Sequence, residues 1–221
     1  MPGTLARRIN AWPEANKVLR WWVYQKERFP IFANGLLIFV FSLSAVSYSR
    51  LLRGDSDLPS FPVAITAFLT CFFFFLLLRI ADEFKDYAED LKYRPYRPVP
   101  RGLIKRRELG ILAAVVMLVQ LLLALWLEPK LSLILLLVWV YWGLMSKEFF
   151  VATWLKARPL QYLWTHMLIM PLIDFYATAC DWLVAGANKA KFDLLWFLVI
   201  SFFNGIVVEI GRKLRAPEDL P

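Results

Sequence analysis

Six runs of predominantly apolar residues, separated by polar stretches, dominate the hydropathy pattern of this sequence. Each run is near the roughly 20 residues that cross a hydrocarbon core as a helix. In lipid every backbone polar group must be satisfied within its own segment, so we expect each run to form a membrane-spanning α-helix. The expected spans cover residues 31–49, 61–78, 109–127, 131–146, 160–179 and 194–208. The fourth and sixth are short, and we expect them to extend past Lys147 and Glu209.

The composition agrees with this interpretation. Apolar residues make up 59% of the 221 residues, whereas a soluble domain averages about 45–50%. The mean hydropathy of +0.52 also excludes intrinsic disorder, because disorder requires low hydrophobicity. The sequence therefore predicts an all-α fold, a polytopic membrane bundle of about six transmembrane helices.

The distribution of lysine and arginine predicts the orientation. Cytosolic loops of membrane proteins carry an excess of both residues. The N-terminal stretch, the second and fourth connections and the tail are rich in them, whereas the other connections contain only Arg50, Arg53, Lys130, Lys189 and Lys191. With six spans the rich segments all lie on one side, which places both termini in the cytosol. The net charge of +8 is then explained by cytosolic loops and anionic membrane lipid, and no nucleic-acid partner is expected.

This organisation divides the chain into three parts. Residues 1–30 form a cytosolic N-terminal segment, residues 31–213 a transmembrane domain, and residues 214–221 a C-terminal tail. In the first part, basic and apolar residues alternate over residues 14–29. This pattern is typical of an interfacial helix on the inner leaflet, and an ordinary juxtamembrane anchor is the alternative.

Charged residues follow the second apolar run without a break. Asp82, Asp86 and Asp90 recur every four residues, so on a helix they share one gently drifting face. Like charges at this spacing destabilise a helix by about 0.2–0.5 kcal/mol per pair. A divalent cation would offset the repulsion, and Mg²⁺ is commonly held by one or two carboxylates together with substrate phosphates. The alternative is a solvated helix end in which neighbouring basic residues pair with the acids.

A proline-stiffened loop with three arginines comes next. It reads Arg94-Pro95-Tyr96-Arg97-Pro98-Val99-Pro100-Arg101-Gly102. The planar guanidinium group donates two parallel hydrogen bonds to a phosphate. Acids for a metal and arginines for the remaining oxygens are what a magnesium–diphosphate complex needs. The whole stretch therefore predicts a diphosphate site at a membrane face.

This combination resembles the UbiA superfamily of intramembrane prenyltransferases. Members of the family carry Asn-Asp-x-x-Asp-x-x-x-Asp at the end of the second helix and then an Arg-x-x-Arg-Pro-x-x-x-Gly-like loop. The present chain reads Asp82-Glu83-x-x-Asp86-x-x-x-Asp90 and then Arg94-Pro95-Tyr96-Arg97-Pro98-x-x-x-Gly102. The first two motif positions differ, Asp for Asn and Glu for Asp, and both keep an oxygen ligand. The resemblance covers roughly residues 30–213 and is strongest over residues 82–102.

The resemblance implies Mg²⁺-dependent transfer of a prenyl group from a prenyl diphosphate to a lipophilic acceptor, aromatic or lipid, within the membrane. The active site would lie on the cytosolic side. The catalytic residues would be Asp82, Asp86 and Asp90, and these three together with Glu83 would be the metal ligands. The substrate-binding residues would be Arg94, Arg97, Lys147, Glu209 and Lys213.

Lys147 enters this set through a second similarity. Residues 141–147 resemble the family's tyrosine-to-lysine stretch, whose lysine reaches the diphosphate. A lysine at the end of a span is otherwise an ordinary snorkelling anchor.

Two departures from the family pattern leave a second function open. Glu209 stands where the family has a second aspartate-rich motif, but Arg212 and Lys213 follow where further acids are expected. These cations either replace a second Mg²⁺ or mark an inactive site. The family usually has nine helices, so six runs imply a shortened member or part of a longer one. The alternative function is a non-catalytic UbiA-like integral membrane protein that binds a lipid or a protein partner.

Two further features lie within the spans. His166 and Asp174 are eight residues apart in the fifth run and could share a helix face. Ionisable groups inside a membrane are functional candidates, here for contact with the acceptor, although a histidine bonded within a bundle is also common. Phe72–Phe75 could line a channel for a prenyl chain or simply pack against lipid.

Overall fold

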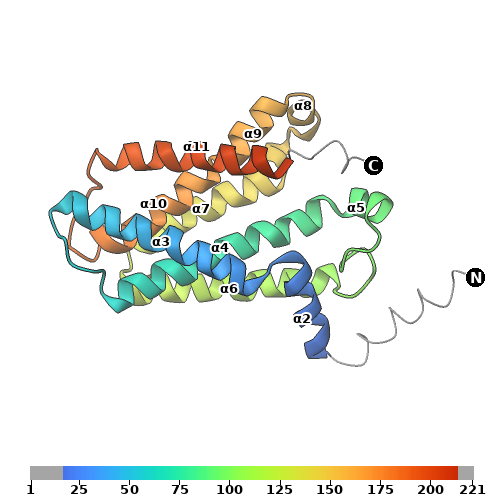
Figure 1. Cartoon of the computed structure of the whole chain (residues 1–221), viewed down its shortest axis with the longest axis horizontal. Helices are drawn as coiled ribbons and strands as arrows, with labels where there is room; N and C mark the ends of the chain where they lie inside the picture. The colour runs from blue at the N-terminus through green and yellow to red at the C-terminus, as the bar shows by residue number, and fades with distance from the viewer. Residues whose placement is uncertain (1–16, 214–221) are drawn as a thin grey trace, which may run out of the picture. The chain divides into compact units, whose positions relative to one another are not determined.

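The computed structural model describes residues 17–213, and in this range it contains helices and no β-strand (Figure 1). The all-α prediction is therefore confirmed. Four helices of this range are long and apolar enough to cross a membrane, which indicates a membrane protein. They are α3 (Ile31–Arg53), α4 (Phe61–Lys85), α6 (Arg106–Leu127) and α11 (Leu194–Lys213). A fifth helix, α7 (Leu131–Ser146), is apolar but has only 16 residues.

The fifth apolar run does not form the single span that we expected. It is divided into α9 (Pro159–Met167) and α10 (Ile169–Trp182), with Leu168 between them. Pro171 explains the break, because a proline lacks an N–H and its ring clashes with the carbonyl four residues earlier. That carbonyl belongs to Met167, the last residue of α9. The division also corrects the expectation that His166 and Asp174 lie on one helix.

The predicted helix extensions had different outcomes. Helix α11 continues past Glu209, as expected. Helix α7 instead ends at Ser146, and Lys147 is its C-terminal cap. The next three residues have positive φ values of 49°, 53° and 60° and form the turn η1 (Glu148–Phe150). Residues other than glycine rarely adopt this left-handed backbone conformation. Because it differs from the conformation of a right-handed helix, the turn separates α7 from α8 (Ala152–Lys156).

The helices belong to two compact units, which we describe separately. The first unit comprises residues 1–39 and 72–120, and the second comprises residues 40–71 and 121–221. Besides parts of α3, α4 and α6, the first unit contains α2 (Lys17–Arg28) and α5 (Tyr87–Tyr93). The remaining helices lie in the second unit.

The core of the first unit lies where α2 meets the C-terminal part of α4 and the loop that follows α5. Its buried members are Tyr24, Ile80, Val99, Leu103, Ile104 and Leu109. Residues 14–16 of the predicted interfacial segment lie outside the described range, but α2 itself is a helix. Because Tyr24 is only 2% exposed within this core, α2 is a packed part of the unit.

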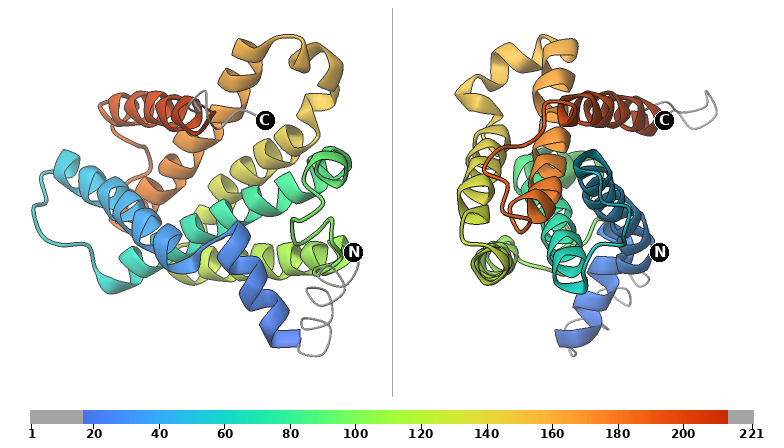
Figure 2. Two further views of the ribbon diagram at one scale, coloured as in Figure 1. Left: turned by 45° about the vertical axis from the view of Figure 1, so that its right-hand side comes forward. Right: turned by 90° about the vertical axis from the view of Figure 1, so that its left-hand side faces the viewer.

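In the second unit α10 packs against both α7 and α11 (Figure 2). Most of its residues are buried. Gly205 of α11 permits one close approach, because a Cβ atom at this position would lie 3.0 Å from Met170 of α10.

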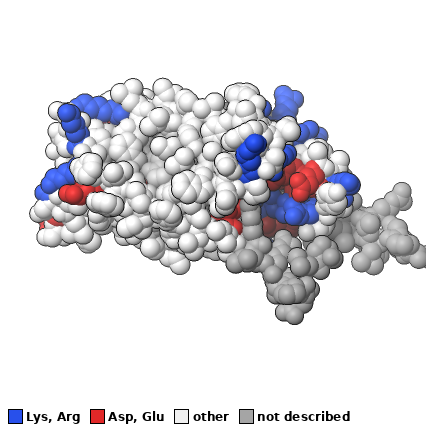
Figure 3. Space-filling model, turned by 90° about the horizontal axis from the view of Figure 1, so that it is seen from above, with Lys and Arg blue, Asp and Glu red and all other residues white. Residues whose placement is uncertain are grey.

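The outer surfaces of the long helices are apolar. On the face shown in Figure 3, charged side chains gather in groups in which both signs lie together, and uncharged surface separates these groups. Large apolar side chains are exposed along the helices, among them Phe32, Leu36 and Leu133. Exposed apolar side chains along long helices are suited to contact with lipid.

Candidate functional site

The acidic motif lies at a bend between two helices of the first unit. Helix α4 ends at Lys85 and α5 begins at Tyr87, with Asp86 at the N-cap position. The expectation of one continuous helix face is therefore wrong at Asp86, whose ψ is 3°. Aspartate favours such positions because its side chain competes with helical hydrogen bonding. The four-residue spacing of the backbone nevertheless persists: the Asp86 N–H donates to Asp82 O at 2.9 Å and the Asp90 N–H to Asp86 O at 2.8 Å.

Asp90 is buried and paired with both motif arginines. Its side chain is 2% exposed. Nη1 of Arg97 donates to its two carboxylate oxygens at 2.6 and 2.7 Å, and Nη1 of Arg94 donates at 3.2 Å. A guanidinium group has five N–H donors, so Asp90 occupies only part of each donor set. Asp90 thus orients the arginines while leaving them donors for an anion.

The arginine loop is held by its own backbone. The Leu103 N–H donates to Pro98 O at 2.9 Å, and the Gly102 N–H donates to Val99 O at 3.0 Å. Gly102 has a φ of 82°, a conformation that suits glycine because it has no Cβ. These bonds fix the conformation of the proline-stiffened loop, and Val99 and Leu103 anchor it to the core of the unit.

Glu83 is engaged by α2. Its side chain is 1% exposed, and its Oε1 accepts a hydrogen bond from Nε of Arg28. Two further pairs connect α2 to the same region, Arg20 with Glu108 and Glu27 with Arg101. The Glu83 carboxylate, which we predicted to be a metal ligand, therefore has a cationic partner in this structure.

Tyr24 connects the charged motif with the apolar core. Its hydroxyl group is buried in α2. Burial is the main cause that raises the pKa of Tyr24 well above its ordinary value of 10.0, and the Glu83 carboxylate is the second. The hydroxyl is therefore neutral at physiological pH and lies within electrostatic reach of the motif.

Asp82 and Asp86 are the more accessible acids of the motif. The side chain of Asp82 is 38% exposed and has Nη1 of Arg79 at 3.5 Å. Asp86 is half-buried and makes no capping hydrogen bond to α5. Among the described residues, no group of three or more His, Cys, Asp or Glu side chains could hold a metal ion by itself. Mg²⁺ commonly takes one or two carboxylates and completes its shell with water and substrate phosphates, and this donor chemistry fits Asp82 and Asp86.

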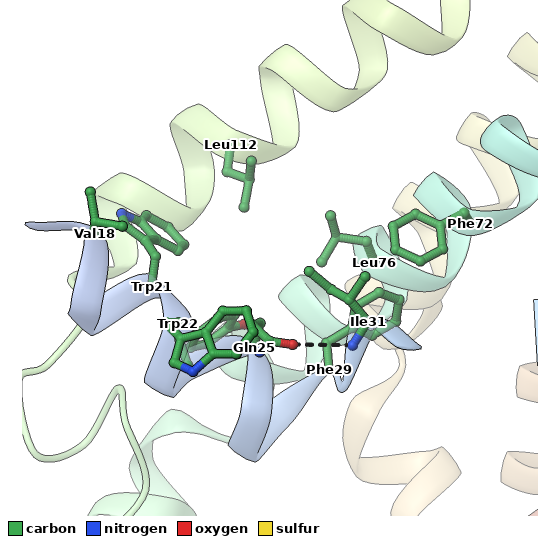
Figure 4. Close-up of a pocket in the computed structure, with 10 residues that line it drawn as sticks. Val18, Trp21, Trp22, Gln25, Phe29, Ile31, Phe72, Leu76 and Leu112 are labelled. Carbon is green, nitrogen blue, oxygen red and sulfur yellow. Dashed lines mark hydrogen bonds between the residues drawn. The ribbon is translucent and has the colours of Figure 1, made fainter. Parts of the chain in front are cut away.

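An apolar pocket of about 340 Å³ lies in the same unit (Figure 4). Side chains from four helices line it, including Trp21 and Trp22 of α2, Ile31 of α3, Phe72 of α4 and Leu112 of α6. Gln25 is also at the pocket, but its Oε1 accepts from the Ile31 N–H at 3.1 Å. Tyr24 belongs to the lining as well. One residue of the pocket lining, Tyr24, is therefore within electrostatic reach of Glu83.

The other predicted substrate-binding residues belong to the second unit. Lys147 is exposed at the end of α7 beside the left-handed turn, and Glu209 is half-buried near the end of α11. The side chain of Lys213 lies outside the described part of the chain. Near Lys147, the Tyr141 hydroxyl donates to Thr165 O at 2.5 Å.

His166 and Asp174 have separate environments. The ring of His166 stacks on Tyr162 with centroids 3.9 Å apart, and its Nδ1 lies 2.9 Å from Tyr162 O. Asp174 is buried in α10. The stacking and hydrogen bonding of His166 favour the structural interpretation of this residue.

Sequence reasoning missed a second buried cluster, around Asp181 at the end of α10. This side chain is 1% exposed. Its Oδ2 accepts from Ser49 Oγ at 2.7 Å and Arg53 Nε at 3.0 Å, while its Oδ1 accepts from Arg53 Nη2 at 2.7 Å. Arg50 Nη1 is 3.7 Å away. The available signal was the pair of arginines at the end of the first apolar run, but nothing in their spacing indicates a partner 128 residues away.

Comparison of the chain with protein-family models, with curated proteins and with solved structures gives no match.

Proposed function

We propose that this chain transfers a prenyl group from a prenyl diphosphate to a lipophilic acceptor within the membrane, as the resemblance to the UbiA superfamily implies. One observation carries the proposal: the acid–arginine motif (residues 82–102) and a pocket of almost entirely apolar lining occur in the same unit, and Tyr24 of the pocket lining lies within electrostatic reach of Glu83. A prenyl diphosphate has the corresponding two parts, a charged head and a hydrocarbon chain. Phe72, from the phenylalanine run of α4, lines the pocket.

The residues of the motif have distinct roles in this proposal. Arg94 and Arg97, oriented by Asp90, neutralise the diphosphate as it leaves with the bonding electron pair. Asp82 and Asp86 would hold Mg²⁺, which supplies further stabilisation of the leaving anion. Preorganised charges of this kind usually make the largest contribution to catalysis. The apolar pocket keeps water away from the allylic carbon, so that the acceptor captures it instead.

The proposal includes a topology. The long helices α3, α4, α6 and α11 would span the bilayer, and α7 and the α9–α10 pair would complete six spans. Both termini and the acid–arginine motif would then face the cytosol, in agreement with the distribution of lysine and arginine.

The test is transfer of label from a radioactive prenyl diphosphate into the lipid extract of membranes that contain the protein. Asp86→Ala should reduce Mg²⁺-dependent transfer by about a hundredfold or more, the size of effect seen when one stabilising group is removed from an active site. Glu89→Ala is the matched control, because Glu89 is an exposed acid of the adjacent α5. Unchanged transfer by the Asp86 variant would refute the proposal.

A second candidate is the non-catalytic UbiA-like protein that binds a lipid or a protein partner. The pairing of Glu83 with Arg28 and of Asp90 with Arg97 favours it, because both carboxylates already have cationic partners. Equilibrium binding of the prenyl diphosphate, measured separately from transfer, distinguishes the two. Binding without turnover supports the second candidate, whereas turnover supports the enzyme.

A further inference from the structure

A second pocket lies in the second unit, at one end of two candidate spans. It has a volume of about 340 Å³, and its lining includes Arg53, Trp182, Lys189 and Lys191. Arg53 is the last residue of α3, and Leu194, which also lines the pocket, is the first residue of α11. The ends of membrane-spanning helices lie at the level of the lipid headgroups.

The pocket is assembled by local structure. At the end of α10, the Gly186 N–H donates to Leu183 O at 2.9 Å and the Ala187 N–H donates to Trp182 O at 2.9 Å. These two bonds form a Schellman motif, in which Gly186 takes a φ of 77°. The chain then turns back, so that Lys191 Nζ donates to Leu52 O at the end of α3, at 2.6 Å. Lys191 and Arg53 are thus held at the pocket by defined contacts.

The charge of the pocket favours an anion. Its lining contains three cations, Arg53, Lys189 and Lys191, and no acid. Asp181 pairs with Arg53 and neutralises one of them, which leaves an excess of two positive charges. The three connections that are poor in lysine and arginine contain five such residues, and all but Lys130 line this pocket or contact Asp181.

The buried indole N–H of Trp182 also favours an anionic ligand. Trp182 is 8% exposed, and its indole Nε1 has no hydrogen-bond partner among the described residues. The indole N–H can only donate, and leaving a buried donor unpaired costs about 1–3 kcal/mol. A phosphate oxygen in the pocket would be a suitable acceptor. Beside the pocket, Leu195 and Trp196 are exposed on the first turn of α11 and offer a surface for acyl chains.

We propose that this pocket binds the phosphate of an anionic phospholipid, with Lys189, Lys191 and Arg53 as the cationic partners and the Trp182 indole as an additional donor. The inference does not depend on prenyl transfer, because all the residues concerned lie in the second unit and none belongs to the acid–arginine motif. Basic pockets between transmembrane helices are a known physical solution for lipid headgroups.

The test is binding of phosphatidylglycerol and phosphatidylcholine to the purified full chain in detergent, measured by native mass spectrometry. We expect phosphatidylglycerol to bind about tenfold more tightly, and the double variant Lys189→Gln/Lys191→Gln to lose about tenfold or more of this affinity, because each basic residue contributes about a fivefold factor. Trp182→Phe, which keeps the aromatic ring but not the donor, should weaken binding less. The matched control is Lys105→Gln/Arg107→Gln, which removes two exposed charges elsewhere.

Three results would overturn the inference. The first is phosphatidylglycerol binding by the double lysine variant with the affinity of the parent, and the second is an equal loss of affinity in the control variant. The third is displacement of phosphatidylglycerol by equimolar inorganic phosphate, which would identify a site for the free anion. Because both lysines are exposed, the double variant should fold, and an unchanged melting temperature without added lipid checks this.

Discussion

Two buried aspartates, one in each unit, are surrounded by arginines in different ways. Asp90 is paired with Arg94 and Arg97, which are four and seven residues away in the sequence. Asp181 is paired with Ser49 and Arg53, which are 132 and 128 residues away. The first cluster shapes one loop, whereas the second joins the ends of α3 and α10. A local cluster can be inferred from a motif, but a cluster that connects distant helices is visible only in the structure.

Arg97 and Arg53, the closest partners of the two aspartates, have similar access to solvent, whereas the second arginines of the clusters, Arg94 and Arg50, differ. The side chains of Arg94 and Arg97 are 36% and 22% exposed, and those of Arg53 and Arg50 are 21% and 15% exposed. After loss of its carboxylate, an arginine with more exposure can turn to water and recover hydration. The cost of removing the aspartate should therefore be larger in the second unit.

Asp181→Ala should have the largest effect on stability. It leaves the positive charges of Arg53 and Arg50 without the buried carboxylate that neutralises them, and it removes the hydrogen-bond acceptor of Ser49. Breaking a buried pair by removal of one partner costs about 3–5 kcal/mol, which is a large part of the stability of most proteins. The measurement is the free energy of unfolding by reversible denaturation in mixed micelles.

Asp181→Asn is the control for this variant, because its amide oxygen can still accept hydrogen bonds in a side chain of the same size. It should be more stable than the alanine variant. If the alanine variant unfolds with the free energy of the parent, the cluster does not stabilise the fold.

Asp90→Ala should have a smaller effect on stability, about 2 kcal/mol, the size expected for hydrogen bonds to a charged group. The variant should also transfer the prenyl group more poorly than its loss of stability explains, because Arg94 and Arg97 lose their orientation. The KM for prenyl diphosphate should therefore rise at a temperature at which the variant is folded. Equal losses of stability in the Asp90 and Asp181 variants would contradict the comparison.

The same distinction explains which parts of the fold could be predicted. Four of the predicted spans lie within the long apolar helices of the structure, because crossing lipid requires a long apolar segment in which the helix satisfies its own backbone. The prediction of one continuous helix was wrong over residues 160–179, because hydropathy weighs Pro171 only as one residue among many, although its geometry interrupts a helix.

In the candidate site, the sequence indicated the chemistry of the side chains but not their partners. The proximity of Asp90 to Arg94 and Arg97 followed from the short distances along the chain. The engagement of Glu83 by Arg28 did not, because that pair joins residues 55 positions apart. Pairing of this kind depends on how α2 packs against α4, and a hydropathy pattern contains no information about that arrangement.

Asp55→Asn should have the smallest effect on stability. It tests the ion pair of Asp55 with Arg50, which also lies beside Asp181. The Asp57 backbone N–H and the Arg50 guanidinium hydrogen-bond to the Asp55 carboxylate and lower its pKa below the ordinary value of 3.8. A group with a lowered pKa stabilises the folded protein above its unfolded pKa, and the stabilisation is lost as the pH falls through the folded pKa. The variant should therefore melt slightly below the parent at pH 6, and the difference should disappear as the pH falls below about 4. Melting curves of both proteins across this range provide the measurement. A difference that grows on acidification would show that Asp55 does not stabilise the fold as a carboxylate.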